Sequence, residues 1–234
     1  MQKNIIATIA IVPTGILLLG IIGTLQGNTT DTLDLSITPV TKATGSPEQH
    51  LTEEVLLTSA SSTQTSRSTV HTVPFFSQFD DISHPEWRRV GCGIAALAML
   101  IDFYGPDRTS VDHLLDKGIA ANAFLRNAGW IHAGLISLAN EYGLYGDTYS
   151  YSHLSMPDAF SRLKAVMEEG PVMVSVHYTF DPKNPIPHLV VVNGVHDGRI
   201  YYNDPAEATG GGSISIERFQ SSWKKRYIKL RPTA

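Results

Sequence analysis

The chain has 234 residues, a formal net charge of −4 at pH 7 and a single cysteine. One cysteine excludes an internal disulfide and a zinc site built from paired cysteines. The mildly acidic balance is atypical of proteins that bind nucleic acid, so we expect no nucleic-acid partner.

The first segment of the chain is apolar. Residues 5–23 form a run of 19 residues without a charge, and a helix of that length spans about 28 Å, close to the roughly 30 Å hydrocarbon core of a bilayer. We therefore predict that residues 1–27 are a membrane anchor with the lipid bilayer as partner. The alternative is a signal peptide whose removal leaves a secreted protein, although the adjoining TLQGNTT offers no convincing cleavage site. Lys3 precedes the run, which favours a single-pass protein of the cell membrane with its remaining residues outside the cytoplasm.

Residues 28–70 differ sharply in composition from the rest of the chain. Serine and threonine occupy 18 of these 43 positions, and every Phe, Tyr and Trp of the chain lies at or after Phe75. A segment of this composition buries too little apolar surface to offset the entropy of ordering, which predicts a disordered linker or stalk. Residues 71–234 are then the globular domain, which is long enough for a hydrophobic core.

Helices dominate the first half of this domain. Residues 73–79 are expected to be a short strand or an extended segment. Turn and capping residues then delimit four helices, which begin at Cys92 or Gly93, after Ser110, within residues 129–143, and after Ser155. Glycines end three of them, at Gly105, Gly143 and Gly170.

Strands dominate the second half. The pattern changes to an apolar alternation typical of strands at residues 172–178, and further strands are predicted at 188–195, 199–203 and 226–230. Asp197 and Gly198 form a hairpin turn between two of them, and residues 217–223 are expected to form a helical turn. Helices followed by an antiparallel sheet indicate an α+β fold.

Cys92 is the first candidate for chemistry. A lone cysteine is usually a small buried hydrophobe. Cys92, however, lies between Gly91 and Gly93 at the predicted start of a helix, where free N–H groups and the helix dipole stabilise a thiolate. A thiolate is a nucleophile, so this position suits a catalytic cysteine.

A nucleophilic cysteine needs a base, and the base needs a partner that orients its ring. His188 begins a predicted strand directly after a loop, and His177 lies near the end of the preceding strand. Asp204 and Asn203 both end the strand that comes after the hairpin, and only one of them can face the histidine because side chains alternate along a strand. The residues alone leave both pairs of alternatives open.

Several strings of the domain occur together in one known family. VPFFSQ, then Trp87, GCGIAALAML, HLVVVNGV and NDP succeed one another in the chain. In this order they resemble the cysteine peptidases of family thirty-nine, which include the double-glycine peptidases that process bacteriocin leaders. The resemblance covers about residues 71–230. It implies a papain-like cysteine peptidase fold in which N-terminal helices pack on a C-terminal antiparallel sheet.

The resemblance also implies roles for individual residues. It assigns Cys92 as nucleophile, His188 as general base and acid, Asp204 as orienting residue and Gln78 as oxyanion-hole donor. The activity it implies is that of a cysteine peptidase acting on a peptide or protein substrate. Together with the predicted anchor and topology, this gives a membrane-anchored, extracytoplasmic enzyme, and we expect no cofactor or metal. The chain contains no G-x-x-x-x-G-K-[ST] phosphate loop, so a secreted or surface peptide is expected rather than a leader peptide cleaved during export. The alternatives are a catalytically inactive peptide-binding module of the same fold and a thiol acyltransferase.

Overall fold

The computed structural model of the chain describes residues 69–106 and 108–233. The predicted anchor of residues 1–27, with its apolar run 5–23, and all but the last two residues of the predicted linker lie outside the described residues. Within the described part of the chain, no helix is both long and apolar enough to cross a membrane.

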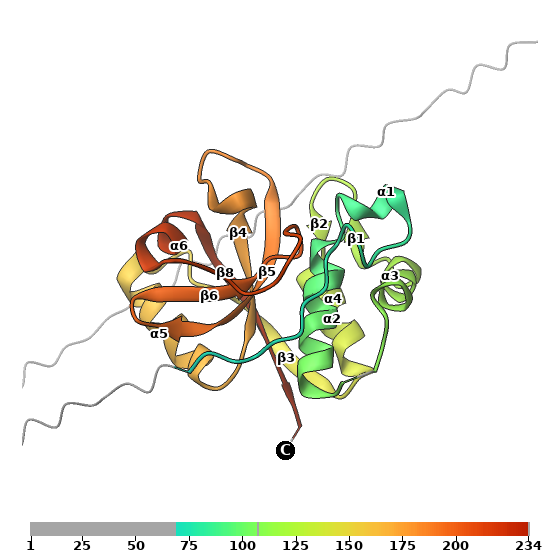
Figure 1. The fold of residues 1–234 in the computed structure, drawn as a ribbon, viewed down its shortest axis with the longest axis horizontal. Coiled ribbons are helices and arrows are strands. Elements are labelled where there is room, and N and C mark those ends of the chain that lie inside the picture. Colours follow the sequence, from blue (N-terminus) through green and yellow to red (C-terminus); the bar gives the residue numbers. More distant parts are fainter. Residues whose placement is uncertain (1–68, 107, 234) are drawn as a thin grey trace, which may run out of the picture. The chain divides into compact units, whose positions relative to one another are not determined.

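A six-stranded sheet forms the centre of the C-terminal half (Figure 1). Its strand order is β3-β8-β4-β5-β6-β7, and every neighbouring pair is antiparallel. The strands of this sheet are β3 (Leu144–Ser150), β4 (Val172–His177), β5 (Pro187–His196), β6 (Arg199–Asn203), β7 (Gly212–Ser215) and β8 (Trp223–Pro232). A separate two-stranded sheet pairs β1 (Phe124–Leu125) with β2 (Gly129–Trp130).

Helices cover both faces of the large sheet. They are α1 (Pro85–Arg88), α2 (Cys92–Tyr104), α3 (Val111–Ala120), α4 (His132–Asn140), α5 (Met156–Glu168) and α6 (Ile216–Ser222), with a 3₁₀ turn, η1 (Tyr178–Phe180), after β4. In Figure 1, α2, α3 and α4 lie on one side of the strands, and α5 and α6 lie on the other. The predicted α+β class with an antiparallel sheet is confirmed.

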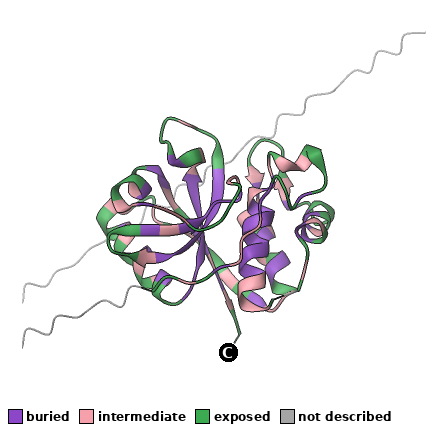
Figure 2. Ribbon diagram, viewed as in Figure 1, coloured by how far each residue is buried: buried purple, intermediate pink, exposed green. Residues whose placement is uncertain are grey.

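Strand β4 explains how one sheet carries two cores. Its residues are almost entirely buried, and they alternate between two apolar clusters. Val172, Val174 and Val176 pack with residues of α5 and α6, whereas Met173 packs with residues of α2 and α4. The strand is therefore covered by helices on both faces, as the purple centre of Figure 2 illustrates.

Helix α2 is the most deeply buried helix of the domain. Residues from Gly93 to Ile101 are all buried, which agrees with a sequence that is apolar on every side rather than along one stripe. The helix ends at Tyr104 with Gly105 as its C-cap, as predicted. A rigid, buried helix gives its first residue, Cys92, a fixed position.

The predicted caps of two other helices are confirmed. The hydroxyl of Ser110 accepts a hydrogen bond from the N–H of His113 at 3.2 Å, at the start of α3. The hydroxyl of Ser155 accepts one from the N–H of Asp158 at 3.2 Å, at the start of α5. Both helices begin where a side chain satisfies one of the N–H groups that lack a partner within the helix.

Some elements differ from the sequence prediction. The helix expected within residues 129–143 is limited to α4, since Gly129 has φ of +80° and lies in β2, and Gly143 has φ of +77° in the turn after the helix. Strand β3 was not predicted, and it places one strand of the sheet between α4 and α5 in sequence. Its side chains are mostly exposed, so it lacks the apolar alternation on which strand prediction relies.

Candidate active site

The chain before α1 brings Gln78 to the sheet. Of the residues 73–79 predicted as a strand or an extended segment, residues 73–77 are extended and a turn begins at Gln78, and backbone hydrogen bonds tie this segment to β5 and to the turn after β6. The N–H of His71 donates to the carbonyl of Asn193 at 2.9 Å, and the N–H of Gln78 donates to the carbonyl of Pro205 at 2.8 Å. Gln78 is buried, and its Nε2 donates to the carbonyl of Arg88 at 2.8 Å. That bond uses one of the two amide hydrogens and leaves the second for a ligand.

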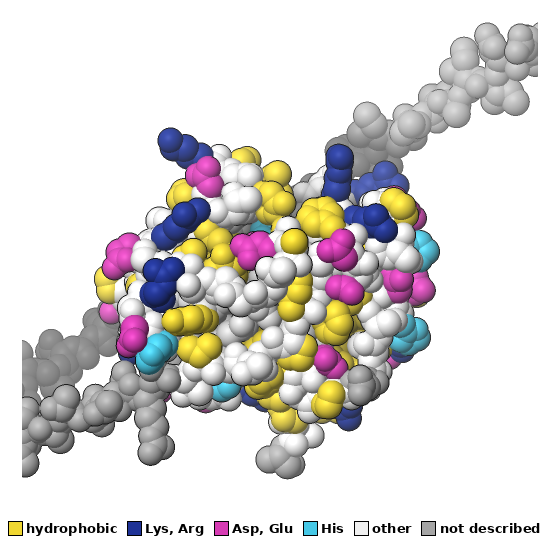
Figure 3. Space-filling view, viewed as in Figure 1, with side chains coloured by type: hydrophobic (Ala, Val, Ile, Leu, Met, Phe, Trp, Pro, Cys, Tyr) yellow, Lys and Arg dark blue, Asp and Glu magenta, His cyan; other side chains and the backbone are white. Residues whose placement is uncertain are grey.

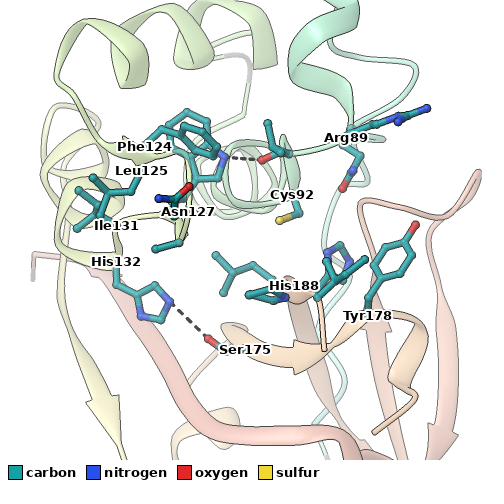
Figure 4. Close-up of a pocket in the computed structure, with 18 of the residues that line it drawn as sticks. Arg89, Cys92, Phe124, Leu125, Asn127, Ile131, His132, Ser175, Tyr178 and His188 are labelled. Carbon is teal, nitrogen blue, oxygen red and sulfur yellow. Dashed lines mark hydrogen bonds between the residues drawn. The ribbon is translucent and has the colours of Figure 1, made fainter. Parts of the chain in front are cut away.

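Cys92 is the first residue of α2 and borders a pocket (Figure 4). The glycines beside it are required by packing within the domain. A Cβ at Gly91 would lie 2.2 Å from Cδ1 of Ile82, and a Cβ at Gly93 would lie 2.8 Å from the indole of Trp130. Trp130 is itself fixed, because its Nε1 donates to the carbonyl of Val90 at 2.7 Å.

This packing yields a stability prediction for Gly93→Ala. Alanine favours a helix over glycine by about 1 kcal/mol, so propensity alone predicts stabilisation. The contact with Trp130 outweighs it, and we expect a net loss of about 1–3 kcal/mol, as for other overpacked cores. Thermal unfolding of the full chain checks this, and an unchanged or raised Tm would contradict the assignment of the glycine to packing.

His188 and Asp204 meet at the end of the hairpin. His188 lies near the start of β5, and Asp204 comes directly after the last residue of β6, the strand antiparallel to β5. The Nε2–H of His188 donates to Oδ1 of Asp204 at 2.5 Å, and both side chains are buried. The N–H of Ala206 donates to the same oxygen at 2.8 Å, and the ring of Tyr178 packs edge-on against the imidazole. These contacts fix the orientation of the ring.

The two alternatives left open by the sequence lie elsewhere. The buried side chain of Asn203 is hydrogen-bonded to the backbone: its Nδ2 donates to the carbonyl of Val73 at 3.0 Å, and its Oδ1 accepts from the N–H of Gly211 at 2.8 Å. His177 hydrogen-bonds the carbonyl of Asn184 through Nδ1 at 2.9 Å. The geometry therefore joins His188 with Asp204.

The thiol and the imidazole form a coupled pair. Burial opposes ionisation of Cys92, but its hydrogen bond with His188, the charge of that ring and the backbone N–H of Leu189 outweigh burial and lower the pKa of the thiol. Burial also opposes the charged form of His188, yet hydrogen bonds with Asp204 and Cys92 raise the pKa of the imidazole. Since Nε2 is paired with Asp204, the ring nitrogen left for the thiol is Nδ1. The arrangement favours a thiolate beside an imidazolium.

The pocket beside this pair has a volume of about 850 Å³. Gln78, Cys92 and His188 all line it, so the structure brings three predicted site residues to one cavity, with Asp204 behind the histidine. Three large hydrophobic side chains that are exposed to solvent also line it, namely Phe79, Leu125 and Ile186. Figure 4 shows Leu125 and His188 on opposite sides of the pocket, which is therefore a cleft between the helical side and the sheet.

The described residues contain no group of three or more His, Cys, Asp or Glu side chains arranged to hold a metal ion.

Other pocket residues were missed by sequence reasoning, and four of them gather near the sheet: His132, Ser175, Lys224 and Arg226. The run KKR at residues 224–226 is the one signal that could have indicated a basic site, but a basic run is usually a solvated surface.

Known proteins resemble this arrangement in fold. The family model described as Peptidase_C39 like family matches residues 70–230. Comparison with curated proteins gave no significant match. Among solved structures, a double-glycine-motif protease from a transporter, crystallised with a leader peptide, has 23% sequence identity and a TM-score of 0.51, covering 70% of this chain and 95% of its own. A protein of Bacillus anthracis described as a C39-like peptidase has 18% identity and a TM-score of 0.54, covering 72% of this chain and 99% of its own.

Proposed function

The chain belongs to the Peptidase_C39 like family and has the fold of a peptidase domain, and from this premise we propose that it is a cysteine peptidase in which Cys92, His188, Asp204 and Gln78 form the catalytic site. The hydrogen-bonded series of Cys92, His188 and Asp204 is the observation that carries the proposal. It supplies a nucleophile, a base and a group that orients the base, the three parts that acyl transfer by a thiol requires.

Hydrolysis then proceeds in two steps. The Sγ thiolate of Cys92 attacks the carbonyl carbon of the scissile amide, and His188 Nδ1–H donates its proton to the leaving amine as the C–N bond breaks. In the second step neutral His188 takes a proton from water, the hydroxide oxygen attacks the thioester carbonyl, and the C–S bond breaks to release the acid and restore the thiolate. Asp204 accepts the Nε2–H bond throughout and stabilises the imidazolium.

Two donors can stabilise the oxyanion of each step. As the first residue of α2, Cys92 has an N–H without a carbonyl partner four residues earlier in the helix. The second hydrogen on Nε2 of Gln78 is the other donor, and the bond from this nitrogen to Arg88 fixes the amide beside the pocket. Preorganised donors of this kind act on charge that develops in the transition state.

Gln78→Ala is therefore expected to lower kcat by about 10²- to 10³-fold, with a much smaller change in KM. Steady-state hydrolysis of one peptide by the full chain and the variant measures both parameters. Gln49→Ala, in the predicted linker, is the matched control and should leave kcat unchanged. An effect on KM alone would remove Gln78 from the transition state and make it a substrate-binding residue.

The proposed function is tested by incubating the full chain with a broad peptide pool under reducing conditions. We expect hydrolysis that stops after alkylation of Cys92, with new amino termini identified by mass spectrometry. Binding of peptides without turnover would support the inactive-module alternative, and amide products formed with an added amine would support the acyltransferase. Absence of thiol-dependent turnover on any peptide would contradict the proposed function.

We further propose that residues 5–23 anchor the protein in the cell membrane with the peptidase domain outside the cytoplasm. The uncharged run and Lys3 before it support this orientation. Protease protection in intact cells tests it, since a domain outside the cytoplasm is digested without lysis. Release of the full domain into the medium would support the secreted alternative.

A further inference from the structure

The lining of the pocket is basic. Apart from the Cys92–His188 pair, the charged side chains that line it are all lysine or arginine and none is a carboxylate: Arg89, Arg126, Lys224 and Arg226. The chain as a whole carries a net charge of −4. On the face of the domain shown in Figure 3, acidic, basic and hydrophobic side chains are intermixed, so the composition of the pocket differs from that of this surface.

A β-bulge places two of these basic residues. In the pairing of β4 with β8, Ser175 is opposite Arg226 and Val176 is opposite Trp223, so Lys224 and Lys225 are inserted into β8. Lys225 has φ of +53°, a conformation that a side chain other than glycine rarely adopts. Its Nζ donates to the carbonyl of Leu154 at 2.7 Å, which helps to hold it there. Bulges redirect side chains, and this one leaves Lys224 and Arg226 both lining the pocket.

These two cations lack an acidic partner. In the part of the chain that the structure describes, no salt bridge involves either Lys224 or Arg226. Desolvation and the positive charge of Arg226 lower the pKa of Lys224. Two neighbouring cations repel each other, and an anion that binds between them offsets this repulsion.

A buried hydroxyl lies next to the cations. Ser175 is buried, lines the pocket and pairs across the sheet with Arg226. Its Oγ lies 3.4 Å from Nε2 of His132, whose Nδ1 lies 3.1 Å from Oγ1 of Thr148, as Figure 4 shows for the first of these contacts. Burial and the charge of Arg226 lower the pKa of His132 to about 4, so this ring is neutral at physiological pH and adds no charge of its own.

From these observations we propose that Lys224, Arg226 and Ser175 form a carboxylate-binding subsite of the cleft, and that the protein prefers peptides with an acidic group near the scissile bond. The inference rests on the proposed function, because it names the substrate class of the same site. Lys224 and Arg226 supply charge-assisted hydrogen bonds to the carboxylate, and the hydroxyl of Ser175 donates a further one. His132 is a positioning residue that holds the hydroxyl.

The register of the sheet sets the distance of this subsite from the reactive sulfur. Arg226 pairs with Ser175, and Ser175 pairs with Leu189, whose N–H faces the thiol of Cys92. Two strand spacings amount to about 10 Å, and an extended peptide spans about 3.3 Å per residue. The acidic group is therefore expected within about three residues of the scissile bond.

Binding to the Cys92→Ala variant of the full chain tests the subsite without requiring turnover. The probes are fluorescein-labelled octapeptide pools that are random except for one fixed position, which carries Glu or Gln, and each pool is made with a C-terminal acid and a C-terminal amide. We expect about tenfold tighter binding of the Glu pools, or of the C-terminal acids, than of their neutral counterparts. The first result identifies an acidic side chain as the ligand, and the second identifies a C-terminal carboxylate.

Double variants in which two cations are replaced by glutamine then show which residues cause the preference for acidic peptides. Lys224→Gln with Arg226→Gln should reduce the ratio of acidic to neutral binding to less than about twofold. Lys164→Gln with Arg162→Gln, which removes the same charge from α5, should leave this ratio unchanged. Equal binding of acidic and neutral pools, or a preference that persists without Lys224 and Arg226, would overturn the inference. Failure of the wild-type chain to hydrolyse a pool that it binds would contradict the proposed function but would not contradict the carboxylate-binding subsite.

Discussion

Replacement of Cys92 by alanine should reduce peptide hydrolysis to background, a loss of at least about 10⁴-fold in kcat. The reason is that Cys92 is the nucleophile paired with His188, whereas the hydroxyl of Ser175 lies beside His132, a histidine of low pKa. Hydrolysis of the best peptide of the pool by the full chain and the variant is the measurement.

The control for this variant is its stability. The substitution replaces a half-buried CH2SH side chain by a methyl group and removes only one heavy atom, so the Tm should remain within a few degrees of that of the wild type. Cys92→Ser is a second variant that retains the shape of the side chain, and it should be equally inactive because a hydroxyl beside His188 is a much weaker nucleophile. Turnover that survives in both variants would show that another group carries out the reaction.

His188→Ala is expected to have the second-largest effect, a loss of about 10³- to 10⁴-fold in kcat at neutral pH. The variant removes the proton donor of the first step, the base of the second and the charge that stabilises the thiolate. The remaining activity should rise with pH, since the thiol then ionises at a higher pH than in the wild type. Initial rates between pH 6 and pH 10 measure both the loss and the change of profile.

His177→Ala is the matched control, because it removes a histidine from the neighbouring strand, where the ring contacts the carbonyl of Asn184. It should retain most of the wild-type rate and the wild-type pH profile. The assignment of His188 as base would be wrong if the two variants lost equal activity, or if His177→Ala alone changed the profile.

Local sequence predicted those elements whose boundaries depend on single residues. Ser110 and Ser155 cap helices, Gly105 ends one, and Asp197 with Gly198 turns the hairpin, because each of these residues satisfies or relaxes its own backbone. Strand β3 could not be found in this way. Its pairing with β8 joins segments about 80 residues apart, and its exposed side chains carry no alternation.

The residues of the candidate site also differ in whether local sequence is enough to identify them. Cys92 is indicated by its place at a helix start, whereas the choice of Asp204 over Asn203 needs the register of β5 with β6. Local sequence does not distinguish Gln78 from an ordinary surface glutamine, because Gln78 reaches the pocket through a segment that is hydrogen-bonded to β5 and to the turn after β6. Lys224 and Arg226 line the pocket because of a bulge, which a sequence pattern does not reveal.

The proposed mechanism depends on an ionised thiol at Cys92, and the pH dependence of Cys92 alkylation tests this most directly. The single cysteine makes the signal unambiguous, and no substrate is needed. Because His188 lowers the pKa of the thiol, alkylation of the full chain should already be fast well below the ordinary thiol pKa of about 8.5. The low-pH reaction should disappear in His188→Ala. A slow thiol that titrates near or above about 8.5 in the wild type, or a profile unchanged by His188→Ala, would contradict a thiolate–imidazolium pair and favour the inactive binding module.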